Sequence, residues 1–263
     1  MYRRVRCLHR GTPYFRSTVE LVISPPMKSQ WLSICLFSLL IGACQNQTVV
    51  PPVYSGQVLT AGAMRRVMHQ GKLDAIVRFD SLTERGWYGL GPAVGLRGEV
   101  FLWDGEAWIS RIDTVGQEHV QIEPQAGAPF FVYAQVAEWQ EYPLPDSVKD
   151  LASLENHLAT ITAHWQKPFP FYLSASLDTL QYHVQNLAEG SIVRSPEEAH
   201  RGQVNVGLSG AEGRILGFFS REHQGVFTHH DTWMHLHFFS RDQQHLGHLD
   251  AAQIGEARLY LPL

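Results

Sequence analysis

Cysteine is scarce in this chain, and its placement excludes most of the chemistry that thiols provide. The 263 residues contain three cysteines, Cys7, Cys35 and Cys44, and all of them lie within the first 44 residues. A body without cysteine has no disulfides, no thiolate metal ligands and no cysteine nucleophile. Its stability must come from a hydrophobic core, which the remaining 219 residues are numerous enough to form.

Positive charge is also scarce after Cys44. The first 44 residues hold six of the 21 Lys and Arg residues and one of the 25 Asp and Glu residues, so the body carries a formal charge of about −9. Nucleic-acid phosphates attract a basic face, so this acidic body argues against a nucleic-acid partner. The sequence also lacks a phosphate-binding glycine loop and internal repeats. Few charges and many aromatic residues are typical of a compact, β-rich protein.

The longest apolar run is too short to cross a bilayer comfortably. It covers the 13 residues Trp31–Ala43, follows Met27-Lys28 and ends in Leu40-Ile41-Gly42-Ala43-Cys44. A charged start, a short apolar stretch and small residues before the cut indicate a secretory signal peptide. The ending resembles a bacterial lipobox, which implies cleavage before Cys44 and lipidation of Cys44. We therefore expect an exported lipoprotein on the periplasmic or cell-surface side, held to the membrane through its lipid anchor only.

Residues 1–26 precede this complete signal peptide and carry five arginines. We expect translation to start at Met27, with residues 1–26 as a mis-called extension of the 1–44 leader. A mitochondrial-type presequence is the alternative.

The body divides into a tether and two halves. Residues 45–56, with two prolines and little charge, are typical of a linker. Residues 57–142 form the predicted N-terminal half, and Pro143-Leu144-Pro145 separates it from the C-terminal half, 143–263.

Periodicity predicts two helices among several strands. Apolar residues at helical spacing predict helices over 59–70 and 147–165, the second starting at an apparent capping box, Ser147-Val148-Lys149-Asp150. The turn dipeptide Asp104-Gly105 predicts a hairpin within 91–110. Further strands are predicted over 129–136, 169–177, 214–219 and 257–261, and 190–213 is predicted to be irregular.

Histidines near the C-terminus provide the strongest sign of a site. Seven of the 14 histidines lie between residues 223 and 248. In a strand, residues i and i+2 point to the same face, so His235 and His237 should present two imidazoles side by side. The polar segment 240–244 reads as a turn, after which a return strand can bring His248 beside them. Three neutral imidazoles with an open fourth position are typical of a catalytic metal site.

Zinc is the first expectation for this site, although the same ligands suit iron, nickel or copper. The four neighbouring histidines are expected to be loop residues that do not bind the metal: His223, His229, His230 and His245. A structural or merely exposed role for each histidine is the plainer alternative.

Several segments together resemble the alpha-acetolactate decarboxylase family, in order and spacing from about Ala61 to Leu261. They are Gly89-Leu90-Gly91-Pro92-Ala93-Val94-Gly95-Leu96-Arg97-Gly98-Glu99, Phe171-Tyr172-Leu173, Gly213-Arg214-Ile215-Leu216-Gly217-Phe218, His235-Leu236-His237-Phe238 and Leu246-Gly247-His248. The resemblance implies an α/β (α+β) fold of two domains with mixed β-sheets and few helices, and a homodimer.

The resemblance also implies an activity and a role for each site residue. It implies a zinc-dependent lyase of acetoin biosynthesis, which decarboxylates 2-acetolactate, a 2-hydroxy-3-keto acid, to acetoin and carbon dioxide. His235, His237 and His248 match the family's zinc ligands. Glu99 matches a hairpin glutamate expected to handle the proton, because decarboxylation leaves a carbon that must be protonated. Without the resemblance, Glu99 reads as a solvated charge before a turn.

Three departures from the family pattern favour an alternative. Asn186 stands where the family has an arginine, with Arg194 nearby as a possible substitute. A second glutamate, supplied in the family by a C-terminal tail, has no counterpart before Leu263. Trp233 occupies the place of a glycine. The alternative is a catalytically inactive, metal-binding lipoprotein of the same fold that binds a small ligand. A cupin-like metal enzyme and a purely structural surface protein are the weaker hypotheses.

Overall fold

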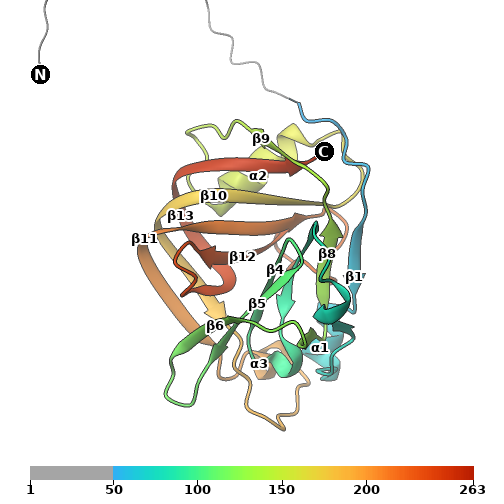
Figure 1. Ribbon diagram of the computed structural model, residues 1–263, viewed down its shortest axis with the longest axis vertical. Helices are drawn as coiled ribbons and strands as arrows, with labels where there is room; N and C mark the ends of the chain where they lie inside the picture. The colour runs from blue at the N-terminus through green and yellow to red at the C-terminus, as the bar shows by residue number, and fades with distance from the viewer. Residues whose placement is uncertain (1–49) are drawn as a thin grey trace, which may run out of the picture. The chain divides into compact units, whose positions relative to one another are not determined.

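The computed structural model describes residues 50–263, which form two large sheets and few helices (Figure 1). The expected signal peptide, the lipidation site Cys44 and residues 45–49 of the tether lie outside the described residues. Within residues 50–263, no helix is both long and apolar enough to cross a membrane. The expected β-rich fold with few helices is therefore confirmed.

The first sheet is formed by six strands in the order β1-β8-β3-β4-β5-β6. Their bounds are β1 Val58–Ala61, β3 Trp87–Pro92, β4 Glu99–Trp103, β5 Glu106–Ile112, β6 Glu118–Ile122 and β8 Phe131–Gln135. The predicted hairpin is confirmed as β4 and β5. Its turn residues Asp104 and Gly105 have φ angles of 51° and 89°, the left-handed conformations that a tight hairpin turn requires.

The second sheet contains the long strands of the molecule, in the order β10-β11-β12-β13-β9. Their bounds are β9 Trp139–Tyr142, β10 Phe169–Val184, β11 Val204–Phe219, β12 Met234–Ser240 and β13 Leu246–Pro262. Because β10 also pairs with β13, these strands close on themselves. Every ladder in both sheets is antiparallel, so the expectation of mixed strand directions is wrong; hairpin connections and long returns join neighbours that run in opposite directions.

The prediction of irregular structure over 190–213 is wrong after residue 203. Strand β11 already begins at Val204, and Val206 and Leu208 pair with Tyr182 and Leu180 of β10. These apolar side chains alternate with exposed polar ones but are only half-buried, so the pattern is weak in the sequence.

The helices are shorter than predicted. Helix α1 is Met64–Gln70, because Val58–Ala61 pair with β8 instead of starting the helix. Helix α2 is Leu151–Ile161, and its N-cap is Asp150, whose carboxylate accepts a hydrogen bond from the Ser153 N–H at 2.8 Å. The capping box is therefore Asp150–Ser153 rather than one that starts at Ser147.

The remaining elements are small. They are helix α3 Pro196–Ala199, the 3-10 turns η1 Phe79–Ser81 and η2 Val94–Leu96, and the two-stranded sheet of β2 Val77–Arg78 and β7 Gly127–Ala128.

Two of the four hydrophobic cores among residues 50–263 hold these layers together. One lies between the sheets, where Phe101 and Val132 of the first sheet meet Phe218 and Phe239 of the second. The other packs α2 against the second sheet through Leu154 and other buried apolar residues. The beginning of β4 therefore faces β12 and β13 across the inter-sheet space.

Candidate metal centre

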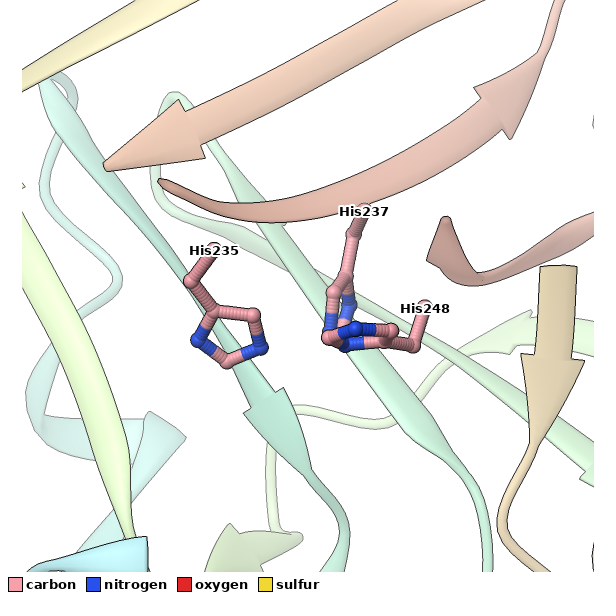
Figure 2. Close-up of side chains that lie close together, drawn as sticks. All are labelled: His235, His237 and His248. Atoms are coloured by element: carbon pink, nitrogen blue, oxygen red, sulfur yellow. The ribbon is translucent and has the colours of Figure 1, made fainter. Parts of the chain in front are cut away.

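The register of three neighbouring strands brings the predicted histidines together. His237 of β12 is paired directly with His248 of β13, because the turn between Ser240 and Leu246 returns the chain in the expected register. His235 lies two residues before His237, on the same face of β12. The ligand nitrogens of His235, His237 and His248 all lie within 4.8 Å of one another, and the rings converge on one point (Figure 2).

The environment of these rings fits a metal ion. His235 and His237 are buried and His248 is half-buried. The Nδ1 atom of His235 and both ring nitrogens of His237 have no hydrogen-bond partner. Buried polar atoms without a partner are costly in a folded protein, and a bound cation would satisfy them. No other group of this kind occurs among residues 50–263.

Burial keeps the three imidazoles neutral, which is the form that binds metal. It lowers the pKa of His237 to about 3 and lowers the pKa values of His235 and His248 well below the usual range. Neighbouring imidazoles reinforce the effect, because a charge on one opposes a charge on the next. The site therefore does not need to release protons to accept a cation near neutral pH.

We expect the metal-free protein to lose stability as the pH falls below about 6.5. The unfolded chain then protonates these histidines while the folded chain does not, so each costs about 1–2 kcal/mol by pH 5. The contribution of Glu99 to the free energy of unfolding changes in the opposite direction over this pH range, because the raised pKa lets folded Glu99 bind its proton at a higher pH than the unfolded chain does. It therefore offsets part of the loss. Urea unfolding at pH 7.5 and pH 5 measures the difference. His237→Gln should make the pH dependence shallower by one histidine, and an equal dependence in both proteins would contradict this account.

Glu99, the predicted proton-handling residue, lies at the edge of the same site. It is the first residue of β4, and its Oε2 is 3.5 Å from Nε2 of His237. Burial raises the carboxyl pKa well above its usual value; the Gln185 N–H, 3.3 Å from Oε1, opposes this shift and Asp250 adds to it. Burial therefore favours the neutral, protonated form of Glu99 in the metal-free protein.

Gly247 allows His248 to reach its place. A Cβ at residue 247 would overlap the Tyr182 ring and crowd the main-chain carbonyl of His183. We expect Gly247→Ala to lower the free energy of unfolding by about 1–3 kcal/mol and to weaken metal binding, since β13 must move away from β10. Gly207→Ala is the control, because its Cβ would meet nothing closer than 4.0 Å. Urea unfolding compares the two, and equal effects would contradict this role of Gly247.

Three more histidines line the pocket beside the metal centre, and sequence reasoning missed them. His183, His200 and His229 share the pocket with Glu99, Gln185 and an apolar side that includes Met64, Met68 and Phe130. His229 was expected to lie in a loop, which it does, but its ring is 5.2 Å from that of His248. His183 lies in β10 directly opposite His248 of β13. Its place in the site could therefore be predicted only by someone who already knew that β10 pairs with β13.

The other loop histidines lie elsewhere. His223 bonds Ser220, His245 bonds Tyr182 and Glu118, and His230 is exposed.

Asn186 does not line the pocket, but its neighbour Gln185 does, with its Oε1 buried and unpaired. Arg194 lies on the exposed cap of α3, where its N–H donates to Glu198. Trp233 packs against Phe219. Among the described residues, no arginine or lysine lines the pocket.

The fold and the site define a class of protein, in which a candidate metal centre lies on a β-sheet. Three convergent, neutral imidazoles lie between two antiparallel sheets, with a buried acid next to them. Such a ligand set is typical of a metal site with an open coordination position.

Comparison with known proteins places the chain within that class. The sequence profile of the alpha-acetolactate decarboxylase family matches residues 60–262. The chain therefore belongs to the alpha-acetolactate decarboxylase family. A search of curated proteins found no significant match.

Solved structures share the fold. The alpha-acetolactate decarboxylase of Bacillus subtilis strain 168 is 18% identical, with a TM-score of 0.61 over 78% of this chain and 84% of that one. A Staphylococcus aureus protein of unknown function, described as similar to alpha-acetolactate decarboxylase, is 16% identical, with a TM-score of 0.62 over 78% and 84%.

Proposed function

We propose that this protein is a zinc-dependent carboxy-lyase that converts 2-acetolactate to acetoin and carbon dioxide. The observation that carries the proposal is the placement of Glu99, a buried acid, 3.5 Å from a histidine of the three-imidazole site. His235, His237 and His248 would hold the zinc ion. When bound, the ion would supply electrostatic stabilisation of the negative charge that develops on the substrate oxygens.

The chain's own residues account for the proton balance. Loss of carbon dioxide from the 2-acetolactate anion breaks one carbon–carbon bond and leaves its electron pair on the substrate. One proton must then be added to carbon to give acetoin. Glu99 carries that proton in its neutral state, and its fixed position on β4 would deliver it from one side of the substrate. The apolar side of the pocket, from Met64, Met68 and Phe130, would exclude water from the reacting carbon.

Acetoin release from racemic 2-acetolactate tests the proposal. The purified, zinc-loaded protein should release acetoin well above spontaneous decay, and His237→Ala should abolish the excess. A folded, zinc-bound protein that releases no excess acetoin would overturn the assignment.

One observation favours a second candidate, a metal-binding protein of the same fold that binds a small ligand without turnover. No arginine or lysine among the described residues lines the pocket, although the substrate is an anion. A tight, stoichiometric ligand complex that is stable for hours would support it.

We further propose that the protein is an exported lipoprotein attached through Cys44, and that it forms a homodimer. Support for the first comes from the lipobox-like ending of the signal peptide, and for the second from the family. Cys44→Ala should release the protein from the membrane fraction, and light scattering of the released protein measures its mass.

A further inference from the structure

The three histidines His183, His200 and His229, called here the outer histidines, lie between two cavities. They line the pocket at the metal centre and also a groove on its outer side, whose other walls include Gln203 and Asn205. They therefore form the partition between the metal centre and the groove.

Each outer histidine has ring nitrogen capacity that the fold does not use. The Nδ1 atom of His183 lies 2.9 Å from both carboxylate oxygens of Asp250, which leaves its Nε2 free. The rings of His200 and His229 make no hydrogen bond to any described residue. The His200 ring lies 6.2 Å from that of His183, and the His229 ring 5.2 Å from that of His248. An imidazole offers an N–H donor in either protonation state, so these groups can receive an acceptor.

The pocket at the metal centre is too small for the substrate, whereas the groove beyond the partition is large enough. The pocket at the metal centre has a volume of about 20 Å³, which suits a water molecule or an ion. The outer groove has a volume of about 560 Å³, within the usual range for small-molecule sites. A five-carbon acid whose oxygens approach His235, His237 and His248 can extend past the outer histidines into this groove. A second groove of about 370 Å³ also borders His248, but Glu155, Asp231 and Asp250 on its walls disfavour an anion.

The free N–H groups of the outer histidines, rather than charged side chains, indicate which end of the substrate lies at the partition. No arginine or lysine among the described residues lines either cavity, and the only carboxylate in the groove, Asp250, already bonds His183. We propose that His200 and His229 bind the carboxylate of a 2-hydroxy acid substrate through their N–H groups, with His183 held beside them by Asp250. This rests on the proposed function for the identity of the substrate. The carbon–carbon bond that breaks would then point toward the groove, which gives carbon dioxide a route to solvent.

Binding of an unreactive analogue tests the recognition site without turnover. The probe is 2-hydroxy-2-methylpropanoate, which lacks the keto group that accepts the electron pair, and its neutral amide is the comparison. We expect His200→Leu and His229→Leu each to weaken binding of the acid to the zinc-loaded protein roughly ten-fold, because each removes one donor to a charged acceptor. Binding of the amide should change less than about three-fold, and His200→Gln and His229→Gln, which keep an N–H donor, should retain most of the affinity. Calorimetry measures all of these.

His230→Leu is the control, because His230 is exposed and lines neither cavity. Zinc stoichiometry and urea unfolding of each variant establish that the fold and the metal site persist, and the single glutamine variants provide the comparison if a leucine variant does not fold. Equal acid affinity in the wild type and the leucine variants would place the carboxylate on the metal ion and overturn the proposal. Acetoin release reports separately on the proposed function. If the wild type shows no turnover but the leucine variants still bind the acid more weakly, the recognition site stands and only the proposed reaction is overturned.

Discussion

Glu99→Gln should lower kcat for acetoin release by about 10²–10⁴-fold, the contribution typical of a positioned general acid. Glutamine keeps the volume of the side chain and an oxygen that can accept the Gln185 N–H, but it carries no transferable proton. Because burial raises the pKa of Glu99 and so disfavours its charged form, replacing it with a neutral amide should leave the free energy of unfolding of the metal-free protein at pH 7 unchanged or higher. Steady-state kinetics, zinc stoichiometry and urea unfolding together measure this result.

Glu118→Gln is the matched control, since it alters a half-buried, hydrogen-bonded glutamate outside the site. Glu118 accepts hydrogen bonds from Ser110, Tyr182 and the Leu246 N–H, and so joins β6 to the start of β13. Its substitution should cost about 2–3 kcal/mol of stability, because charge-assisted bonds are lost. Turnover should remain within a few-fold of wild type. If Glu99→Gln retained activity within ten-fold, Glu99 would not be the proton donor.

Zinc should stabilise the protein strongly, and His237→Ala should remove most of that gain. At a free zinc concentration 1,000 times the dissociation constant, the expected increase in the free energy of unfolding is about 4 kcal/mol. For a body of this size, that is roughly 8–16 °C in Tm. Loss of a group that only supports a metal ligand weakens metal binding by up to about 100-fold. Loss of one of the three ligands themselves should therefore weaken zinc binding by more than about 100-fold. The gain at the same zinc concentration then falls to about 1.4 kcal/mol or less.

His230→Ala separates the metal effect from general loss of histidine, since His230 is exposed and is not one of the three clustered histidines. Its zinc-induced shift in Tm should equal that of the wild type. A wild-type protein whose Tm does not respond to zinc would show that the three imidazoles bind another metal or none, and parallel titrations with iron, nickel and copper salts would distinguish these outcomes.

The clustering of His235, His237 and His248 could be predicted from the sequence because their placement depends on local geometry. The spacing of His235 and His237 requires only the two-residue period of a strand, and His248 requires only one short turn. The hairpin around Asp104 and Gly105 was predictable for the same reason.

Features that depend on distant pairing could not be predicted. His183 reaches the site because β10 pairs with β13, whose residues lie more than sixty positions later in the chain. His200 and His229 come from connecting segments whose course depends on the packing around them. The start of β11 was missed because its side chains are only half-buried. The start of α2 was missed because Asp150, three residues after the predicted cap Ser147, caps the helix instead.

The short ladder between β12 and β13 makes the length of one turn critical. These strands pair only from His237 to Phe239 and from Leu246 to His248. The long ladder with β10 holds β13 in place, so a single residue inserted between Ser240 and Leu246 has to bulge out of the turn. If β13 shifted by one position instead, the His248 side chain would turn to the opposite face of the sheet. Most surface loops tolerate such insertions and deletions. In this turn, we expect length to be the property that selection preserves, because an added residue that displaced β13 would dismantle the metal centre without altering any of the three histidines.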